Sequence, residues 1–226
     1  MGVKRYSSFR PSRFRLLVTA GPTREMLDPV RFLSNVSTGR MGYEMARKAK
    51  QMGFRVVLIS GPTALKPPRG VSFVSVLTAR EMKKTIFRYW PKTDALVMTA
   101  AVCDYTPVRF SPRKIKRIEQ KTIPFKRTVD ILEQVGKRKG SRVVVGFALE
   151  TESVERNALR KLKRKNLDLI VANWYDKKNN PFGDRKTSMV LMGRNGSKRL
   201  LRGMSKAGSA GAILREVLSL LATKKS

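Results

Sequence analysis

Short apolar runs alternate with longer amphipathic segments along the chain. The apolar runs are typical of buried strands, and they occupy residues 14–20, 55–60, 71–76, 94–102, 142–150 and 167–173. The amphipathic segments repeat apolar residues at helical spacing, and they occupy residues 41–52, 79–89, 129–139 and 152–165. Strands that alternate with helices in this way predict an α/β fold of three layers, with helices covering a mostly parallel central sheet.

The pattern changes at both ends of the chain. Residues 187–192 and 197–201 flank a turn rich in Gly, Asn and Ser, and they predict a C-terminal antiparallel hairpin, followed by a closing helix at 206–221. Residues 1–13 form a basic leader without a clear pattern, which can be disordered. We therefore expect a single domain over residues 14–226.

Two internal segments have no regular period. Residues 21–40 are rich in small and polar side chains, and we expect them to form one long loop. Residues 104–128 combine three prolines with many basic residues, which predicts a mobile active-site loop at about 106–128.

The composition excludes several kinds of chemistry. Histidine is absent and Cys103 is the only cysteine. The chain can therefore form no intrachain disulfide and none of the usual zinc sites, and it cannot use an imidazole base. Cys103 is most simply a small buried residue. Neither a long apolar run nor a secretory signal is present, so we expect a cytoplasmic protein without membrane contact.

The charge is extreme, with 49 Lys and Arg against 16 Asp and Glu, a formal net charge of +33. Such a charge favours polyanionic partners and predicts nonspecific contact with nucleic acid. The basic residues are spread along the whole chain, however, and a solvated surface is the simpler explanation of them.

A loop of small residues precedes the helix at 41–52. Ser37, Thr38, Gly39 and Gly42 lie at its mouth, where free amides and the positive end of the helix dipole favour phosphate. The spacing matches neither the dinucleotide fingerprint G-x-G-x-x-G nor the P-loop. A plain Ser or Thr N-cap with a glycine-rich turn explains the same residues equally well.

Further polar residues lie near the ends of strands, where α/β sheets bind ligands. Asp104 follows the strand at 94–102, in which Ala100 and Ala101 let a ligand approach the backbone. Asn35 can donate and accept at once beside an amide or carboxyl substrate. Taken singly, Asn35 and Asp104 are also typical of turns and caps.

Two pairs of lysines are candidates for phosphate binding. Lys114 and Lys116 lie in a proline-flanked segment, where a lysine can neutralise phosphoryl oxygens. Lys161 and Lys165 are four residues apart, on one face of the predicted helix at 152–165. In so basic a chain, ordinary solvated charges account for both pairs as well.

Taken together, these segments resemble the phosphopantothenoylcysteine synthetase family. The matching blocks are "TAGPTREMLDPVRFLSNVSTGRMG", "VVLISGPTAL", "AAVCDYTP" followed by "KIKR", "VVVGFALET" and "RKNLDLIVANW". The resemblance implies a Rossmann-like fold and a ligase of coenzyme A biosynthesis, of the stand-alone bacterial type. Such a ligase joins 4'-phosphopantothenate to L-cysteine through an acyl-cytidylate, with CTP converted to CMP and pyrophosphate. This chemistry needs charge neutralisation and positioning but no histidine.

The resemblance also implies roles for individual residues. The nucleotide site would be formed by Gly21, Ser37, Gly39, Gly42, Asp104, Lys114, Asp130, Phe147, Lys161, Lys165 and Asn173. Within it, Phe147 and Asn173 would lie near the base and ribose, and Lys114 would act in catalysis from a loop that closes over the triphosphate. Lys161 and Lys165 match lysines that accompany CTP use, which favours CTP over ATP.

The second substrate has its own predicted residues. Asn35, Ala100, Ala101 and Asp104 would hold phosphopantothenate and the acyl intermediate, with Asn35 as a second catalytic residue. Arg31 would reach the site of the neighbouring subunit, which implies a homodimer. Mg²⁺ or Mn²⁺ should accompany CTP, with ligands that the sequence does not identify. Because few residues precede the first strand, we expect no flavin here and a separate phosphopantothenoylcysteine decarboxylase as a partner.

Two other functions remain as alternatives. An NAD(P)-dependent oxidoreductase on a Rossmann-like fold would need G-x-G-x-x-G and an acid that ends the second strand, whereas this strand ends in Ser60, Gly61 and Pro62. A basic nucleic-acid-binding protein would be driven by the charge alone.

Overall fold

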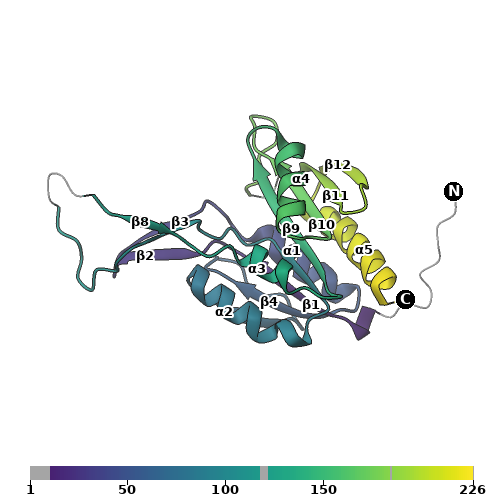
Figure 1. Cartoon of the computed structure of the whole chain (residues 1–226), viewed down its shortest axis with the longest axis horizontal. Helices are drawn as coiled ribbons and strands as arrows, with labels where there is room; N and C mark the ends of the chain where they lie inside the picture. The colour runs from purple at the N-terminus through teal and green to yellow at the C-terminus, as the bar shows by residue number, and fades with distance from the viewer. Residues whose placement is uncertain (1–10, 118–121, 184, 226) are drawn as a thin grey trace.

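The computed structural model describes residues 11–117, 122–183 and 185–225, and it contains one large sheet covered on both faces (Figure 1). The sheet order is β12-β11-β10-β9-β6-β1-β4-β5. Its parallel strands are β1 (Arg15–Ala20), β4 (Arg55–Ser60), β5 (Ser72–Ser75), β6 (Ala95–Met98), β9 (Val143–Glu150) and β10 (Leu169–Trp174). The antiparallel strands β11 (Thr187–Gly193) and β12 (Lys198–Met204) extend one edge. The predicted α/β fold is confirmed.

The helices divide between the two faces of the sheet. They are α1 (Arg40–Gln51), α2 (Ala79–Tyr89), α3 (Ile131–Lys137), α4 (Val154–Arg164) and α5 (Lys206–Lys225). One hydrophobic core lies between the sheet and α1 with α5, and the other lies between the sheet and α2, α3 and α4. In β1 the side chains alternate between these cores, with Leu16 and Val18 in the first and Leu17 in the second. Burial on both faces explains why this strand is a continuous apolar run.

The order of the strands locates the place where a ligand can bind. From β1 the chain passes outward to β4 and β5, and then returns to add β6 on the other side of β1. The strand order therefore reverses at β1, and the loops that follow β1 and β6 diverge at their carboxyl ends. In open α/β sheets this divergence creates the ligand-binding crevice.

The prediction for residues 21–40 was wrong, because the segment is not one long loop. It contains the hairpin of β2 (Arg24–Asp28) and β3 (Arg31–Ser34). The segment 104–128 likewise contains two paired strands, β7 (Tyr105–Pro107) and β8 (Phe125–Arg127). All four strands are short. β3 and β8 are largely exposed, and the buried residues of β2, Glu25 and Asp28, are acids, so these strands lack the apolar runs by which the strands of the main sheet were recognised.

The two hairpins project together from the body as an arm, defined here as residues 24–34, 105–117 and 122–127 (Figure 1). Residues 118–121, in the middle of the predicted mobile loop, lie outside the described residues, as do residues 1–10 of the predicted leader. Residues 11–13 belong to the folded domain, because they form the 3₁₀ helix η1 (Pro11–Arg13) and the carbonyl of Arg13 accepts a hydrogen bond from Arg55. A second 3₁₀ helix, η2 (Trp90–Lys92), follows α2.

A single buried carboxylate joins the two hairpins of the arm. Asp28 Oδ1 accepts hydrogen bonds from the backbone amides of Val30 and Arg31, both at 2.9 Å. Asp28 Oδ2 accepts from Arg31 Nε at 2.8 Å and from the amide of Ile115 at 3.0 Å. Burial raises the pKa of Asp28, but these hydrogen bonds and the positive charge of Arg31 together hold it well below its usual value.

We predict that Asp28→Asn loosens the arm without unfolding the body. The amide side chain loses the charge that these donors stabilise, so the amides of Arg31 and Ile115 should exchange with deuterium at least tenfold faster. Because the pKa of Asp28 is lowered in the folded protein, its carboxylate stabilises the arm fully above about pH 4. This stabilisation is lost only as the pH falls through the lower pKa that Asp28 has in the folded state. Exchange that stays slow in this variant would contradict the assignment, and Asp104→Asn, a nearby exposed acid, serves as the control.

Candidate active site

A cleft of about 800 Å³ opens at the carboxyl ends of the parallel strands. Most of the site residues predicted from the sequence line it, namely Asn35, Ser37, Gly39, Gly42, Ala100, Ala101, Asp104, Asp130, Phe147, Lys161, Lys165 and Asn173. They come from segments far apart in the sequence, and the fold brings them to one place. The cleft lies where the strand order predicts a binding site.

The first wall of the cleft is the amino-terminal end of α1. The N-cap residue is Gly39, with φ of 74°, so the capping position has no side chain. Thr38 Oγ1 accepts a long hydrogen bond, at 3.5 Å, from the amide of Arg40, the first residue of α1. Ser37 Oγ accepts only from the amide of Gly39, at 3.3 Å. The helix thus begins at a glycine and not at a Ser or Thr N-cap. The amide of Gly42 donates back to the carbonyl oxygen of Gly39 at 3.0 Å, and the positive end of the α1 dipole lies at the cleft, where it favours an anion.

Gly42 lets α1 pack directly against the sheet. A Cβ at this position would lie 2.5 Å from Ala20 Cβ, 2.6 Å from Thr99 Oγ1 and 2.9 Å from the carbonyl oxygen of Thr19. Thr19 and Ala20 are the last two residues of β1, and Thr99 directly follows β6. Thr99 Oγ1 donates to the carbonyl oxygen of Thr19 at 2.6 Å and so joins the two strand ends. The absence of a side chain thus brings the helix terminus onto the strand ends.

The opposite wall contains cations from α4 that are paired with acids. Lys161 Nζ lies 2.6 Å from Glu150 Oε1, and Lys165 Nζ lies 2.9 Å from Asp130 Oδ2. The Lys165 side chain is only 17% exposed. The alternative of a solvated charge therefore does not describe Lys165, whereas Lys161 is 35% exposed but held by Glu150. Their positions next to the cleft allow both ammonium groups to contact a bound anion.

Asp130 has a structural role that the sequence did not reveal. Its Oδ1 caps α3 by accepting from the amide of Glu133 at 3.0 Å, while its Oδ2 faces Lys165 and, at 3.5 Å, Arg164. Burial raises the pKa of Asp130. The hydrogen bonds from Lys165 and from the amide of Glu133, together with the positive charges of Lys165 and Arg164, lower it by more, so the pKa lies below its usual value. The carboxylate thus stays ionised and fixes Lys165 at the cleft.

The floor of the cleft is formed by the segment after β6. Asn35 Nδ2 donates to the carbonyl oxygen of Ala101 at 3.2 Å, which holds the β3–α1 loop against this segment. Asp104 is exposed and has no ion pair among the described residues. Cys103, beside it, is buried, and burial raises the pKa of its thiol, as expected for a packing residue.

Three predicted site residues do not line the cleft. Gly21 lies behind Gly39, whose Cβ would meet Gly21 Cα at 3.2 Å, so its part is to support the loop. Arg31 lies on the arm with its Nε and Nη2 bound to Asp28, and its Nη2 also donates to the carbonyl oxygen of Ile115. Lys114 is exposed on the arm.

The structure adds cleft residues that sequence reasoning missed. The charged or polar ones include Arg40, Arg127, Thr128, Glu133, Arg164, Thr187 and Lys206, and the apolar ones include Pro181, Phe182 and Met189. Arg127 and Thr128 lie three and two residues before Asp130, and this short distance along the chain was the one available signal. Lys206 follows the C-terminal hairpin, and no local pattern relates it to the other residues.

No group of three or more Cys, Asp or Glu residues that could hold a metal ion occurs in the described part of the chain. A Mg²⁺ ion that enters with a nucleotide keeps most of its ligands as water and phosphate oxygens, and it needs only one or two carboxylates. The exposed carboxylate of Asp104 fits that requirement. Within the same part of the chain, no helix is both long and apolar enough to cross a bilayer.

Comparison with known proteins agrees with this geometry. A family model for the DNA/pantothenate metabolism flavoprotein C-terminal domain matches residues 12–221. The chain belongs to this family. The coenzyme A biosynthesis bifunctional protein CoaBC of Bacillus subtilis (strain 168) is 43% identical over 207 residues, which are 91% of this chain and 51% of that protein. The chain therefore spans about half the length of this curated relative.

Solved structures extend the family relationship to the fold. The crystal structure of the C-terminal domain of a CoaBC protein matches with a TM-score of 0.80 and 37% identity, covering 93% of this chain and 96% of that chain. A Cab2 mutant in complex with phosphopantothenate-cysteine has a TM-score of 0.79 over 94% of this chain and 88% of that chain, at 15% identity, which shows a shared fold alone. The resemblance to phosphopantothenoylcysteine synthetases is confirmed, and the oxidoreductase alternative loses its support.

We predict that Gly42→Ala pushes α1 away from the sheet. The added methyl group overlaps the backbone and side chains of three neighbours, so the free energy of unfolding should fall by about 1–3 kcal/mol and nucleotide affinity should fall with it. Gly211→Ala in α5 is the matched control, because its Cβ would lie no closer than 3.5 Å to another atom. That variant should be neutral or stabilised by up to about 1 kcal/mol. If denaturant titration gave the two variants the same free energy of unfolding, the close contact at Gly42 would be disproved.

Proposed function

We propose that this chain is a phosphopantothenate–cysteine ligase that uses CTP and proceeds through an acyl-cytidylate. The observation that carries the proposal is one cleft that brings together the amino-terminal end of α1 and two anchored lysines, Lys161 and Lys165. Amides and ammonium groups that converge in this way neutralise a polyphosphate. The names of the relatives agree with coenzyme A biosynthesis.

In the first step, a carboxylate oxygen of 4'-phosphopantothenate attacks the α-phosphorus of CTP, and the bond to the pyrophosphate leaving group breaks. The negative charge that builds on the phosphoryl oxygens is stabilised by the first amides of α1, by Lys161 and Lys165, and by Lys114 when the arm loop closes. Mg²⁺ supplies further charge neutralisation on the triphosphate when it is bound, next to Asp104.

In the second step, the amine of L-cysteine attacks the acyl carbon of the acyl-cytidylate. The C–N bond forms, the bond to the phosphate oxygen breaks, and CMP leaves while the amine loses a proton. Asn35, held by its hydrogen bond to Ala101, orients the carbonyl group of the intermediate. The absence of histidine is compatible with both steps, since each of them depends on positioning and charge stabilisation.

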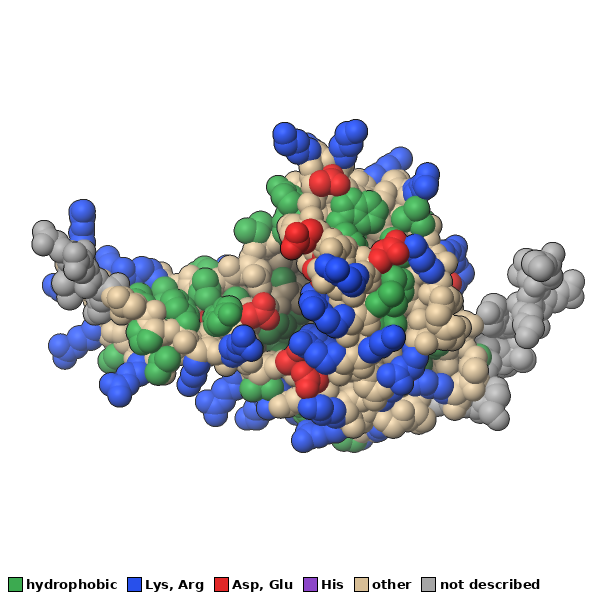
Figure 2. Space-filling view, turned by 45° about the horizontal axis from the view of Figure 1, so that its top comes forward, with side chains coloured by type: hydrophobic (Ala, Val, Ile, Leu, Met, Phe, Trp, Pro, Cys, Tyr) green, Lys and Arg blue, Asp and Glu red, His purple; other side chains and the backbone are tan. Residues whose placement is uncertain are grey.

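The product passes, in this proposal, to a flavin-dependent decarboxylase in the cytoplasm. The relatives named CoaBC are bifunctional, and this chain matches about half the length of the one from Bacillus subtilis. For nucleic acid we propose nonspecific contact only. On the face shown in Figure 2, Lys and Arg side chains are spread over both the arm and the body and are not gathered in one place.

The wild-type protein tests the ligase proposal directly. It should release pyrophosphate from CTP when Mg²⁺ and phosphopantothenate are supplied, and it should form phosphopantothenoylcysteine when L-cysteine is added. ATP should support a lower rate. Failure of every nucleotide to support cysteine-dependent product formation would refute the proposal.

We predict that Lys114→Ala slows acyl-cytidylate formation by roughly 10²- to 10³-fold, because the variant loses one charge at the transferring phosphoryl group. Its melting temperature should not change, since Lys114 is exposed. Single-turnover measurement of pyrophosphate release gives the rate, and Arg113→Ala, an exposed neighbour of the same charge, should leave it unaltered. A normal rate for Lys114→Ala would exclude a role in this step.

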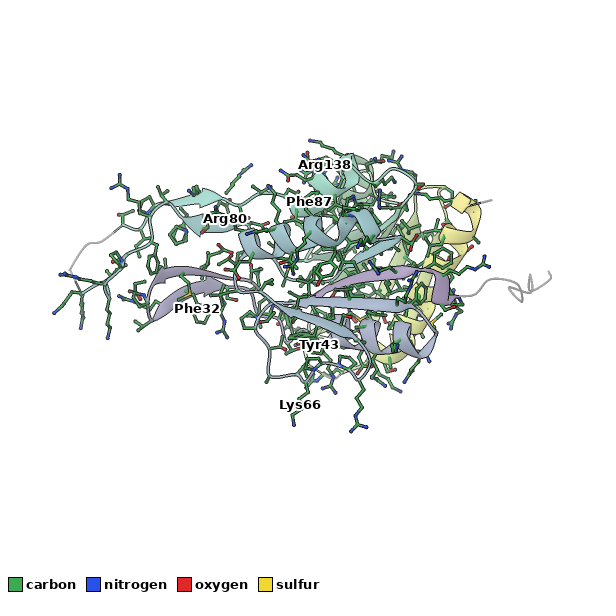
Figure 3. All side chains as sticks on the ribbon, turned by 90° about the horizontal axis from the view of Figure 1, so that it is seen from below. Phe32, Tyr43, Lys66, Arg80, Phe87 and Arg138 are labelled. Carbon is green, nitrogen blue, oxygen red and sulfur yellow. The ribbon has the colours of Figure 1, made fainter. Side chains whose placement is uncertain are left out.

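We also propose that the protein is a homodimer formed through the arm. Large apolar side chains are exposed along it, namely Val30, Phe32, Tyr105, Val108, Phe110 and Phe125. They give the arm the green surface seen at the left of Figure 2. Phe32 lies on the outer part of the arm (Figure 3), with the guanidinium of Arg24 at 4.3 Å from its ring centroid. Apolar patches of this kind mark interaction sites, and a two-fold interface pairs the same surface with itself.

A complementation experiment tests the dimer and the role of Arg31 together. We predict that Arg31→Ala and Asn35→Asp are each nearly inactive alone. If Arg31 serves the partner's cleft, mixing the two variants should restore roughly a quarter of the wild-type sites, because half of the dimers are mixed and each holds one intact site. No recovery in dimers shown to exchange subunits would place Arg31 outside the neighbouring site. Phe32→Glu should shift sedimentation toward the monomer, whereas Leu200→Glu, equally exposed on β12, should not.

A further inference from the structure

The loop between β10 and β11 contains a buried asparagine that the proposed mechanism does not use. Asn179 is only 7% exposed, although it belongs to a surface connection. Its backbone amide donates to Asp176 Oδ1 at 2.6 Å, which closes a tight turn around it. Its side chain points inward, where it meets the end of β10 and the start of β11.

Backbone groups determine how the Asn179 amide is oriented. The amide of Ser188 can only donate, so the side-chain atom 2.8 Å away from it is Asn179 Oδ1. The other atom is then Nδ2, which donates to the carbonyl oxygen of Trp174 at 2.8 Å and has that of Ser188, at 3.2 Å, as a longer acceptor that shares one of its two hydrogens. An inverted side chain would place donor against donor and acceptor against acceptor.

The same atom of Asn179 contacts a residue of the cleft. Asn179 Nδ2 lies 3.0 Å from Asn173 Oδ1, which also accepts from the amide of Trp174 at 2.9 Å. Two donors thus hold the oxygen of Asn173. Its Nδ2, by contrast, has no hydrogen-bond partner among the described residues, although Asn173 lines the cleft. Asn173 therefore presents a donor, not an acceptor, to a ligand.

The surroundings of Asn173 favour the nucleoside end of a nucleotide. Phe147, Pro181, Phe182 and Met189 line the same part of the cleft, formed by β9, β11 and the loop between β10 and β11. Apolar walls with a single oriented polar group are typical of sites for an aromatic ring. The phosphate-binding groups, by contrast, lie at α1 and α4.

We propose that Asn179 is a positioning residue, which holds the Asn173 amide as a hydrogen-bond donor to an acceptor atom of the base. The carbonyl oxygen and ring nitrogen of cytosine are acceptors of this kind. The inference rests on the proposed function in taking a nucleotide as the ligand of the cleft. It adds that base recognition depends on a residue outside the cleft lining.

The variant Asn179→Asp tests this proposal with little change of shape. The carboxylate still accepts from Ser188, but it can no longer donate to Asn173, and it attracts the Asn173 NH₂ away from the ligand. The Kd for CTP, measured by titration calorimetry without the other substrates, should rise about tenfold, as expected for one lost hydrogen bond. The KM for CTP should rise equally, whereas the KM for phosphopantothenate should not change.

Asn180→Asp is the matched control, since it adds the same charge at the next residue and keeps the acceptor that holds the Phe182 amide at 2.9 Å. It should leave the Kd for CTP within about twofold of the wild type. If Asn179→Asp does not fold, Asn179→Ser provides the test, because its shorter side chain keeps an acceptor but cannot reach Asn173. In an Asn173→Ala background, neither change at Asn179 should weaken CTP binding further.

The outcomes separate this inference from the proposed function. A wild type that binds no nucleotide would contradict the ligase proposal and remove the ligand assumed here. A wild type that binds CTP, together with folded Asn179 variants of unchanged Kd, would overturn only the inference. Equal loss of CTP affinity in the Asn180→Asp control would also overturn it, because added negative charge would then be the cause.

Discussion

The close packing of α1 against the strand ends at Gly42 is the contact on which the site depends. Without a Cβ, the first turn of the helix lies directly on Ala20 and on Thr19 and Thr99, at the point where the strand order reverses. Close packing of this kind allows little adjustment, so the positive end of the helix dipole is directed at one place. The cleft forms between this terminus and the ends of the neighbouring strands.

Charge in the cleft is organised by pairing. The chain has a large excess of cations, yet Lys161 and Lys165 are each held by an acid. A partly buried ammonium with one carboxylate partner keeps a defined position, and its remaining hydrogens can still contact an anion. The ion pairs therefore convert ordinary surface charges into oriented ones. The neutral NH₂ group of Asn173 is oriented in a comparable way. Backbone amides, which can only donate, determine which way the side-chain amides of Asn173 and Asn179 are turned.

The arm is a second unit, connected to the site but folded by different forces. Its strands bury little apolar surface, and the buried carboxylate of Asp28 joins its hairpins through charge-assisted hydrogen bonds. An element stabilised in this way can present an apolar surface outward, where a second copy of the chain can cover it. It also places Lys114 and Arg31 away from the body, so their proposed roles require closure of the loop or a neighbouring subunit.

The sequence alone determined the layered α/β fold, because the central strands β1, β4, β6, β9 and β10 are apolar runs and the helices that cover them bury apolar side chains. It also identified the residues around the cleft, since the carboxyl ends of parallel strands must meet at one edge and the motif blocks lie there. It did not reveal the arm strands β2, β3, β7 and β8, because none of them is a continuous apolar run. Only the tertiary structure brought Arg127, Lys206 and Asn179 to the site. Their roles come from contacts between segments far apart in the chain, and no local period records such contacts.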